Sequence, residues 1–105
     1  MRQSQPEAKD YMFHLEQLAK DDVDVLRIKS ASYGNSWKKR GGVGAFMMLA
    51  RKWDRIENAL ANDWDIFKKI QEDARAEDLL DDVRDLRRYL LLVDAEVQAL
   101  MAEKA

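Results

Sequence analysis

The C-terminal part of the sequence carries an apolar repeat that limits the possible folds more than any other feature. Apolar residues recur there at alternating steps of four and three: Leu79, Val83, Leu86, Leu90, Val93, Val97 and Leu100. This period of about 3.5 residues places them on one stripe of a helix, and such a stripe needs a partner surface along its length. The pattern predicts a helix from Glu77 to Lys104, about 42 Å long. A compact domain of this size has a radius of gyration of only ~13 Å, so we expect part of the stripe to pack on another subunit.

The rest of the chain also predicts helices, with one glycine-rich break. All four glycines lie between Gly34 and Gly44, and glycine disfavours helix interiors. Apolar spacing predicts a helix over 11–32, either continuous or split at 20–22, and a second helix over about 43–61. Asn62 or Asp63 should either end this second helix or cap a short element that follows, which carries Trp64.

These patterns define the expected architecture. We predict a single all-α domain over residues 1–105, with a polar tail at 1–9 and a glycine-rich loop at 34–44. It should be a small helical bundle with a long C-terminal helix, completed by formation of a homo-oligomer.

Charge and composition exclude several classes of partner. The net charge of -2 provides no general basic field, so we expect no direct binding to duplex nucleic acid and none to a membrane surface. The longest apolar stretch, 41–50, is too short to span a bilayer. The chain has no cysteine, which excludes disulfides and thiolate chemistry and fits a reducing cytoplasm.

Acidic residues form a second stripe on the long C-terminal helix. Asp78, Asp82, Asp85 and Tyr89 share one flank at helical spacing. Like charges at these spacings repel each other, and a Mg²⁺ ion would offset the repulsion because it prefers carboxylate oxygens. Alternatively, the helix dipole favours acidic residues near the helix N-terminus, and nearby arginines would neutralise them.

The helix predicted over 43–61 carries charges beside its apolar face. Lys52 and Arg55 lie towards one flank, and Glu57 lies on the opposite flank. Cations that face the acidic stripe would form either a salt-bridge network or a site for phosphate and metal.

The glycine-rich segment combines aromatic and basic residues just before a helix. Tyr33, Trp37 and Lys38 are the residues of interest, because backbone N–H groups at a helix N-terminus attract anions. The segment contains no Walker-type phosphate loop. Its glycines could equally relieve a tight turn, and its aromatic side chains could anchor the core.

Three segments together resemble the nucleotide-modification-associated domain family of the first type, common in phages and bacteria. The resemblance extends from about Val23 to Val97 and rests on a Tyr-Gly-Asn-Ser-Trp element at 33–37, the segment 46–55, and an Asp-x-x-Asp-Leu-x-x-Tyr element at 82–89. It implies a role in phage nucleotide or DNA-base modification.

The stretch 82–91 is also similar, more loosely, to the Glu-x-x-Asp-Val-x-x-Tyr-Leu-Leu helix of the MazG-type all-α nucleoside triphosphate pyrophosphohydrolases. This similarity implies Mg²⁺-ligand roles for Asp82 and Asp85. Those enzymes also carry a Glu-Glu-x-x-Glu helix, whereas the stretch 51–57 of this chain is acidic only at Asp54 and Glu57.

Our leading hypothesis is a nucleotide-handling protein, in one version a Mg²⁺-dependent pyrophosphohydrolase. The candidate metal ligands are Asp82 and Asp85, with Asp78 or Glu57. The candidate nucleotide-binding residues are Tyr33, Trp37, Lys38, Lys52 and Arg55. No catalytic residue can be assigned. The alternatives are a non-catalytic nucleotide-binding or sequestering protein and a structural helical interaction protein.

Overall fold

The computed structural model describes residues 6–73 and 76–104, and all regular structure in these ranges is helical. The α-helices are α1 (Pro6–Tyr33), α2 (Gly41–Leu60), α3 (Ile66–Glu72) and α4 (Ala76–Lys104), and a 3-10 turn, η1 (Ser36–Lys38), precedes α2. At 29 residues, α4 is the longest of these helices. The predicted all-α class and the long C-terminal helix are confirmed.

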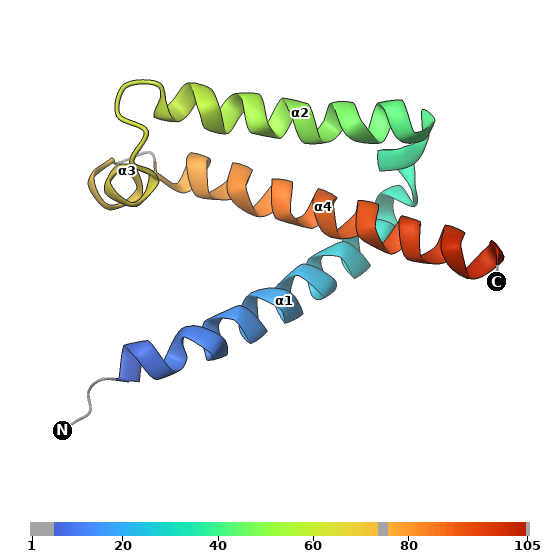
Figure 1. Ribbon diagram of the computed structural model, residues 1–105, viewed down its shortest axis with the longest axis horizontal. Helices are drawn as coiled ribbons and strands as arrows, with labels where there is room; N and C mark the ends of the chain where they lie inside the picture. The colour runs from blue at the N-terminus through green and yellow to red at the C-terminus, as the bar shows by residue number, and fades with distance from the viewer. Residues whose placement is uncertain (1–5, 74–75, 105) are drawn as a thin grey trace. The chain divides into compact units, whose positions relative to one another are not determined.

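The chain divides into two compact units at the Asn35–Ser36 junction. The first contains α1, and the second contains η1, α2, α3 and α4 (Figure 1). The interpretation of residues 1–105 as one domain stays a prediction.

The helix of the first unit is continuous, so the possible split at residues 20–22 does not occur. Asp24 lies 3.1 Å from Lys20 and 3.8 Å from Arg27, and such pairs, one helical turn apart, stabilise a helix. Residues 6–9 of the predicted polar tail belong to the start of α1, and proline suits a first helical turn. Residues 1–5 of that tail lie outside the described ranges.

The glycine-rich loop predicted at 34–44 is correct only as far as residue 40. Gly34 has a φ of +60° and ends α1, with its N–H donating to the Ser30 carbonyl at 2.9 Å. Gly41 has a φ of +71° and begins α2. The prediction is wrong for 41–44 because these residues form the first turn of α2, where the Gly44 N–H donates to the Arg40 carbonyl at 3.4 Å.

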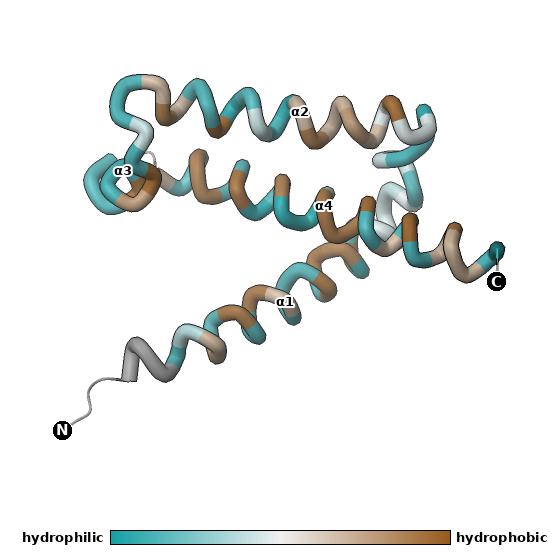
Figure 2. Tube along the Cα trace, viewed as in Figure 1, coloured by the Kyte–Doolittle hydropathy of each residue, from teal (hydrophilic) through white to brown (hydrophobic). Residues whose placement is uncertain are grey.

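In the second unit, α2 and α4 run antiparallel and side by side as a helical hairpin (Figure 1). The short helix α3 packs on α4, near the end where α2 stops. Asp65 caps α3 by accepting a hydrogen bond from the Lys68 N–H at 3.0 Å, so Asn62 and Asp63 are not its cap. The alternative, that one of them ends the preceding helix, is close to the observed end of α2 at Leu60. Apolar positions recur along both long helices of the hairpin (Figure 2).

The apolar core of this unit is small. Ile56 of α2 and Leu79 of α4 are 5% and 4% exposed, and Ala45 is also buried. Farther along α4, Leu90 and Leu100 of the same apolar stripe are each 50% exposed. Within the described residues, the hairpin therefore buries the first part of the predicted stripe and leaves its C-terminal part accessible.

Candidate functional site

Two cations from α2 and two carboxylates from α4 meet between the helices and form what we call the ion-pair cluster: Lys52, Arg55, Asp82 and Asp85. The Arg55 Nε donates to Asp82 Oδ1 at 2.9 Å. The Lys52 Nζ lies 3.0 Å from Asp85 Oδ2 and 3.6 Å from Asp82 Oδ1. The helical spacing 52/55 on one helix and 82/85 on the other places each pair on a single flank, so the four groups converge.

The members of the cluster differ in their access to solvent. The Asp82 side chain is 9% exposed, whereas the Arg55 side chain is 63% exposed. Lys52 and Asp85 lie between these limits, at 24% and 28%. A buried carboxylate is stable only with a partner, so Asp82 depends on the two cations that reach it. The cluster is thus anchored at a buried aspartate and opens to solvent at a guanidinium group.

The acidic residues of the cluster change the pKa of Arg55, which is its most exposed member. The hydrogen bond to Asp82 raises the pKa of Arg55 above its ordinary value, and the negative charges of Asp82, Asp78 and Asp85 act in the same direction. Asp78 is itself exposed one turn before Asp82. Asp78 therefore adds negative charge near Arg55 without being one of the four residues of the cluster.

The predicted metal ligands are only partly brought together. Asp82 and Asp85 both face the Lys52 ammonium group, whereas Glu57 is exposed on α2 and makes none of the cluster's contacts. No group of three or more histidine or acidic side chains suited to a metal ion occurs among the described residues. A protein cage for Mg²⁺ is therefore not preformed there. Two carboxylates do suit a Mg²⁺ ion that also keeps waters and phosphate oxygens.

An apolar cavity of about 430 Å³ lies at the other end of the hairpin, between η1, the start of α2 and the end of α4. It is lined mainly by apolar side chains, among them Phe46, Leu49 and Val97, and it includes the predicted residues Trp37 and Lys38. The Lys38 Nζ lies 2.6 Å from Glu96 Oε1, which ties η1 to α4. The volume falls within the range of small-molecule sites.

The predicted nucleotide-binding residues therefore fall into three places. Lys52 and Arg55 belong to the ion-pair cluster, Trp37 and Lys38 line the cavity, and Tyr33 is the last residue of α1 in the first unit. The sequence reasoning missed Glu96, the partner of Lys38. A signal was present, because Glu96 lies seven residues after Tyr89 and so continues the acidic stripe of α4.

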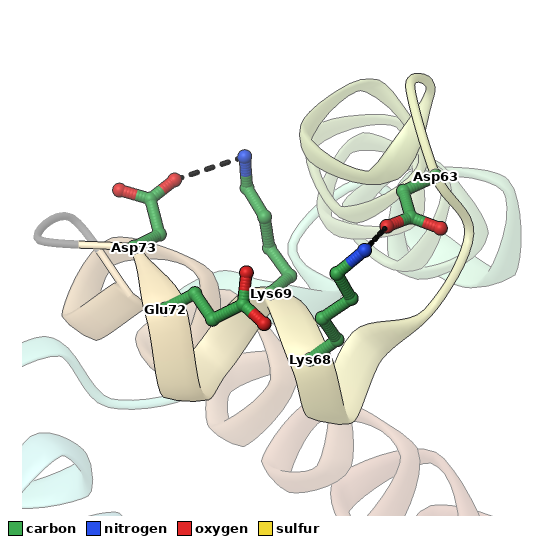
Figure 3. A pocket seen from close by; sticks show the side chains of 5 residues that line it. All are labelled: Asp63, Lys68, Lys69, Glu72 and Asp73. Atoms are coloured by element: carbon green, nitrogen blue, oxygen red, sulfur yellow. Dashed lines mark ion pairs between the residues drawn. The ribbon is translucent and has the colours of Figure 1, made fainter.

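A second hollow of about 400 Å³ is lined only by charged side chains of the 61–65 connection and the α3 segment (Figure 3). Lys68 points to Asp63 at 3.0 Å, and Lys69 points to Asp73 at 2.9 Å. The hydrogen bond to Asp63 raises the pKa of Lys68 above its ordinary value of 10.5. The Lys68–Asp63 pair holds the connection against α3, the Lys69–Asp73 pair joins α3 to its own C-cap residue, and both lysines are occupied by carboxylates.

The fold and the cluster define a small all-α protein with an ion-paired helical hairpin. Comparison with models of protein families, with curated proteins and with solved structures gives no match. Over residues 6–73 and 76–104, none of the helices has the length and apolar character needed to span a bilayer.

Proposed function

We propose that this protein binds a nucleotide, together with Mg²⁺, through the ion-pair cluster. The observation that supports the proposal is the meeting of two cations and two carboxylates from facing helices, with Arg55 open to solvent. Nucleotide phosphates need cationic donors, and phosphate-bound Mg²⁺ needs a few carboxylate oxygens. The cluster offers both kinds of group within one small space.

Binding would proceed by an exchange of ionic partners. Without ligand, Lys52 and Arg55 neutralise Asp82 and Asp85. With ligand, Asp82 and Asp85 would hold the metal, and Lys52 and Arg55 would turn to phosphate oxygens. Such an exchange leaves no buried charge without a partner, which is the condition for an ionic site to be stable in both states. The metal would screen the phosphate charge and, in an enzyme, activate a water molecule.

The cavity supplies a candidate site for the base. Trp37 offers an indole face for stacking, and Lys38 offers a donor once its bond to Glu96 opens. Both residues lie in the same unit as the cluster, beside the same two helices. The stacking role predicted for Tyr33 stays a separate proposal because that residue belongs to the first unit.

Whether the bound nucleotide is hydrolysed defines two versions of the proposal. Hydrolysis needs a base for the attacking water, and Lys52 and Arg55 are cations on the helix where the pyrophosphohydrolases carry glutamates. This difference favours binding or sequestration over catalysis. We include a cytoplasmic setting in the proposal, since the chain lacks cysteine and the ligand is a nucleotide.

Thermal unfolding with a panel of nucleotides, each with and without Mg²⁺, tests the proposal. A ligand raises the melting temperature by an amount that grows with the ratio of its concentration to its Kd. We expect a nucleotide to stabilise the protein only when Mg²⁺ is present, and Arg55→Gln to remove most of the shift. Arg51→Gln, at an exposed arginine of the same helix outside the cluster, is the matched control and should keep it. No stabilisation by any nucleotide would refute the proposal.

A structural helical interaction protein is the second candidate. It is favoured by the small core and by the large apolar side chains that remain exposed on α2 and α4, such as Phe46 and Leu90. A homo-oligomer, as the apolar stripe of α4 predicts, would bury them.

A further inference from the structure

One side of the α2–α4 hairpin carries a set of exposed, large apolar side chains, which we call the apolar face. On α2 they are Phe46 and Trp53, exposed by 63% and 54%. On α4 they are Leu90, Val97 and Met101, exposed by 50%, 43% and 64%. Single exposed apolar side chains are common, but several of them gathered on one surface mark an interaction site.

The apolar face does not include the flanks that carry the ion-pair cluster. At about 100° per residue, Ile56 and Ala45 mark the direction in which α2 faces α4. Lys52 and Arg55 project to one side of that direction, and Phe46 and Trp53 project to the other. On α4, Leu90 and Val97 continue the stripe of the buried Leu79, whereas Asp82 and Asp85 lie about 60° and 120° to one side of that stripe. The hairpin therefore has an ionic side and an apolar side.

The size of the apolar face matches what a stable dimer buries. Large side chains bury roughly 150–250 Å² each, and the exposed fractions of these five leave on the order of 500 Å² of apolar surface. A standard interface buries about 800 Å² per partner, of which about 65% is apolar in homodimers. The expected apolar share is thus about 520 Å², close to what the face offers.

We propose that the apolar face binds a second copy of this chain. The repeat supports this partner: Phe46 and Trp53 are seven residues apart on α2, and so are Leu90 and Val97 on α4. Stripes of this period are the seams of helical bundles. A symmetric dimer contact needs the same patch on both copies, and two hairpins packed face to face form a four-helix bundle. The ion-pair cluster stays on the outer side. Phe46 and Val97 of the apolar face also line the cavity proposed for the base, so the dimer and the base would share that end of the hairpin.

The mass of the full chain in solution, measured by sedimentation equilibrium, tests this proposal. We expect twice 12.2 kDa for the unaltered chain and a fall to half of that value for Leu90→Glu. Leu91→Glu is the matched control, because Leu91 is 42% exposed but projects away from the apolar face; this variant should stay dimeric. A mass of 12.2 kDa for the unaltered chain would overturn the proposal and mean that the face is covered within one chain.

A second readout keeps the test valid if Leu90→Glu fails to fold, which circular dichroism would reveal. The chain has no cysteine, so Asn58→Cys accepts a single spin label at an exposed position of α2. Pulsed dipolar spectroscopy should give one intermolecular distance, and unlabelled chain should dilute that signal. Absence of a dipolar signal would again refute the dimer. Because neither experiment involves a nucleotide, their failure is distinguishable from failure of the nucleotide proposal.

Discussion

The Lys52 ammonium group lies 3.0 Å from Asp85 and 3.6 Å from Asp82, so one cation of α2 holds two carboxylates of α4. Without Lys52, those carboxylates, less than one helical turn apart, would repel each other across a poorly hydrated interface. The contact therefore stabilises the hairpin, and it also keeps the two carboxylates oriented towards one point. Which of these effects matters for function can be decided by substitution.

Asp85→Asn separates the structural role from the ligand role. Without ligand, the variant should lose about 1–2 kcal/mol of unfolding free energy, between the values typical of surface and buried pairs. If the cluster binds Mg²⁺ and nucleotide, the variant should also lose the stabilisation that they confer. Chemical denaturation with and without both ligands measures the two effects. Asp81→Asn, at an exposed aspartate of the same helix, should change neither. Equal ligand stabilisation of the Asp85 variant and the unaltered protein would contradict the proposed ligand role.

Two neighbouring glycines at the start of α2 should respond oppositely to alanine. Gly41 has a φ of +71°, while Gly42 does not need a left-handed backbone, and an added Cβ meets no atom within 4 Å at either position. Gly41→Ala should therefore destabilise the protein by about 1 kcal/mol. Gly42→Ala should stabilise it by about 0.5–1 kcal/mol, because alanine restricts the unfolded chain. Urea denaturation of both variants measures the contrast, and equal effects would show that α2 begins in another way.

The Lys68–Asp63 pair makes a prediction about pH. The pKa of Lys68 is raised above 10.5, mainly by its hydrogen bond to Asp63. A raised folded-state pKa means that the pair stabilises the fold below the unfolded value, and that this stabilisation is lost as pH rises through the folded value. Asp63→Asn should lower the pKa of Lys68 towards 10.5, as followed by NMR titration of the side-chain nitrogen. Asp54→Asn, on α2 outside this pair, should leave the titration unchanged.

Much of the fold follows from local patterns in the sequence. The apolar repeat of α4 predicted a helix from residue 77 to 104, and the observed helix begins one residue earlier, at Ala76. The helix ends are less predictable: the helix expected from about residue 43 begins at Gly41, because a cluster of glycines does not show which of them ends the loop. Only Gly34 and Gly41 adopt a positive φ, whereas Gly42 and Gly44 lie within the first turn of α2. Composition cannot distinguish these uses of glycine, since the difference lies in the backbone.

The sequence predicts which charged residues of the candidate site share a helix flank, but it does not predict which of them form ion pairs. Helical spacing placed Asp82 and Asp85 on one flank, and it placed Lys52 and Arg55 near the facing flank. The partners depend on the register of α2 against α4, which no local pattern specifies. The Lys38–Glu96 contact joins residues 58 positions apart, and such a contact becomes visible only once the two helices are aligned.

The three tryptophans of the chain are distributed so that each reports on a different part of the second unit. Trp37 lines the apolar cavity, Trp53 lies on the apolar face, and Trp64 occupies the turn before α3 with a φ of +62°. Indole fluorescence responds to contact with water, so variants that keep one tryptophan at a time would act as intrinsic optical probes. The emission of Trp53 should shift to shorter wavelength as protein concentration rises, and that of Trp37 should respond to a bound base. Assembly and ligand binding can thus be followed separately in this chain without an attached dye.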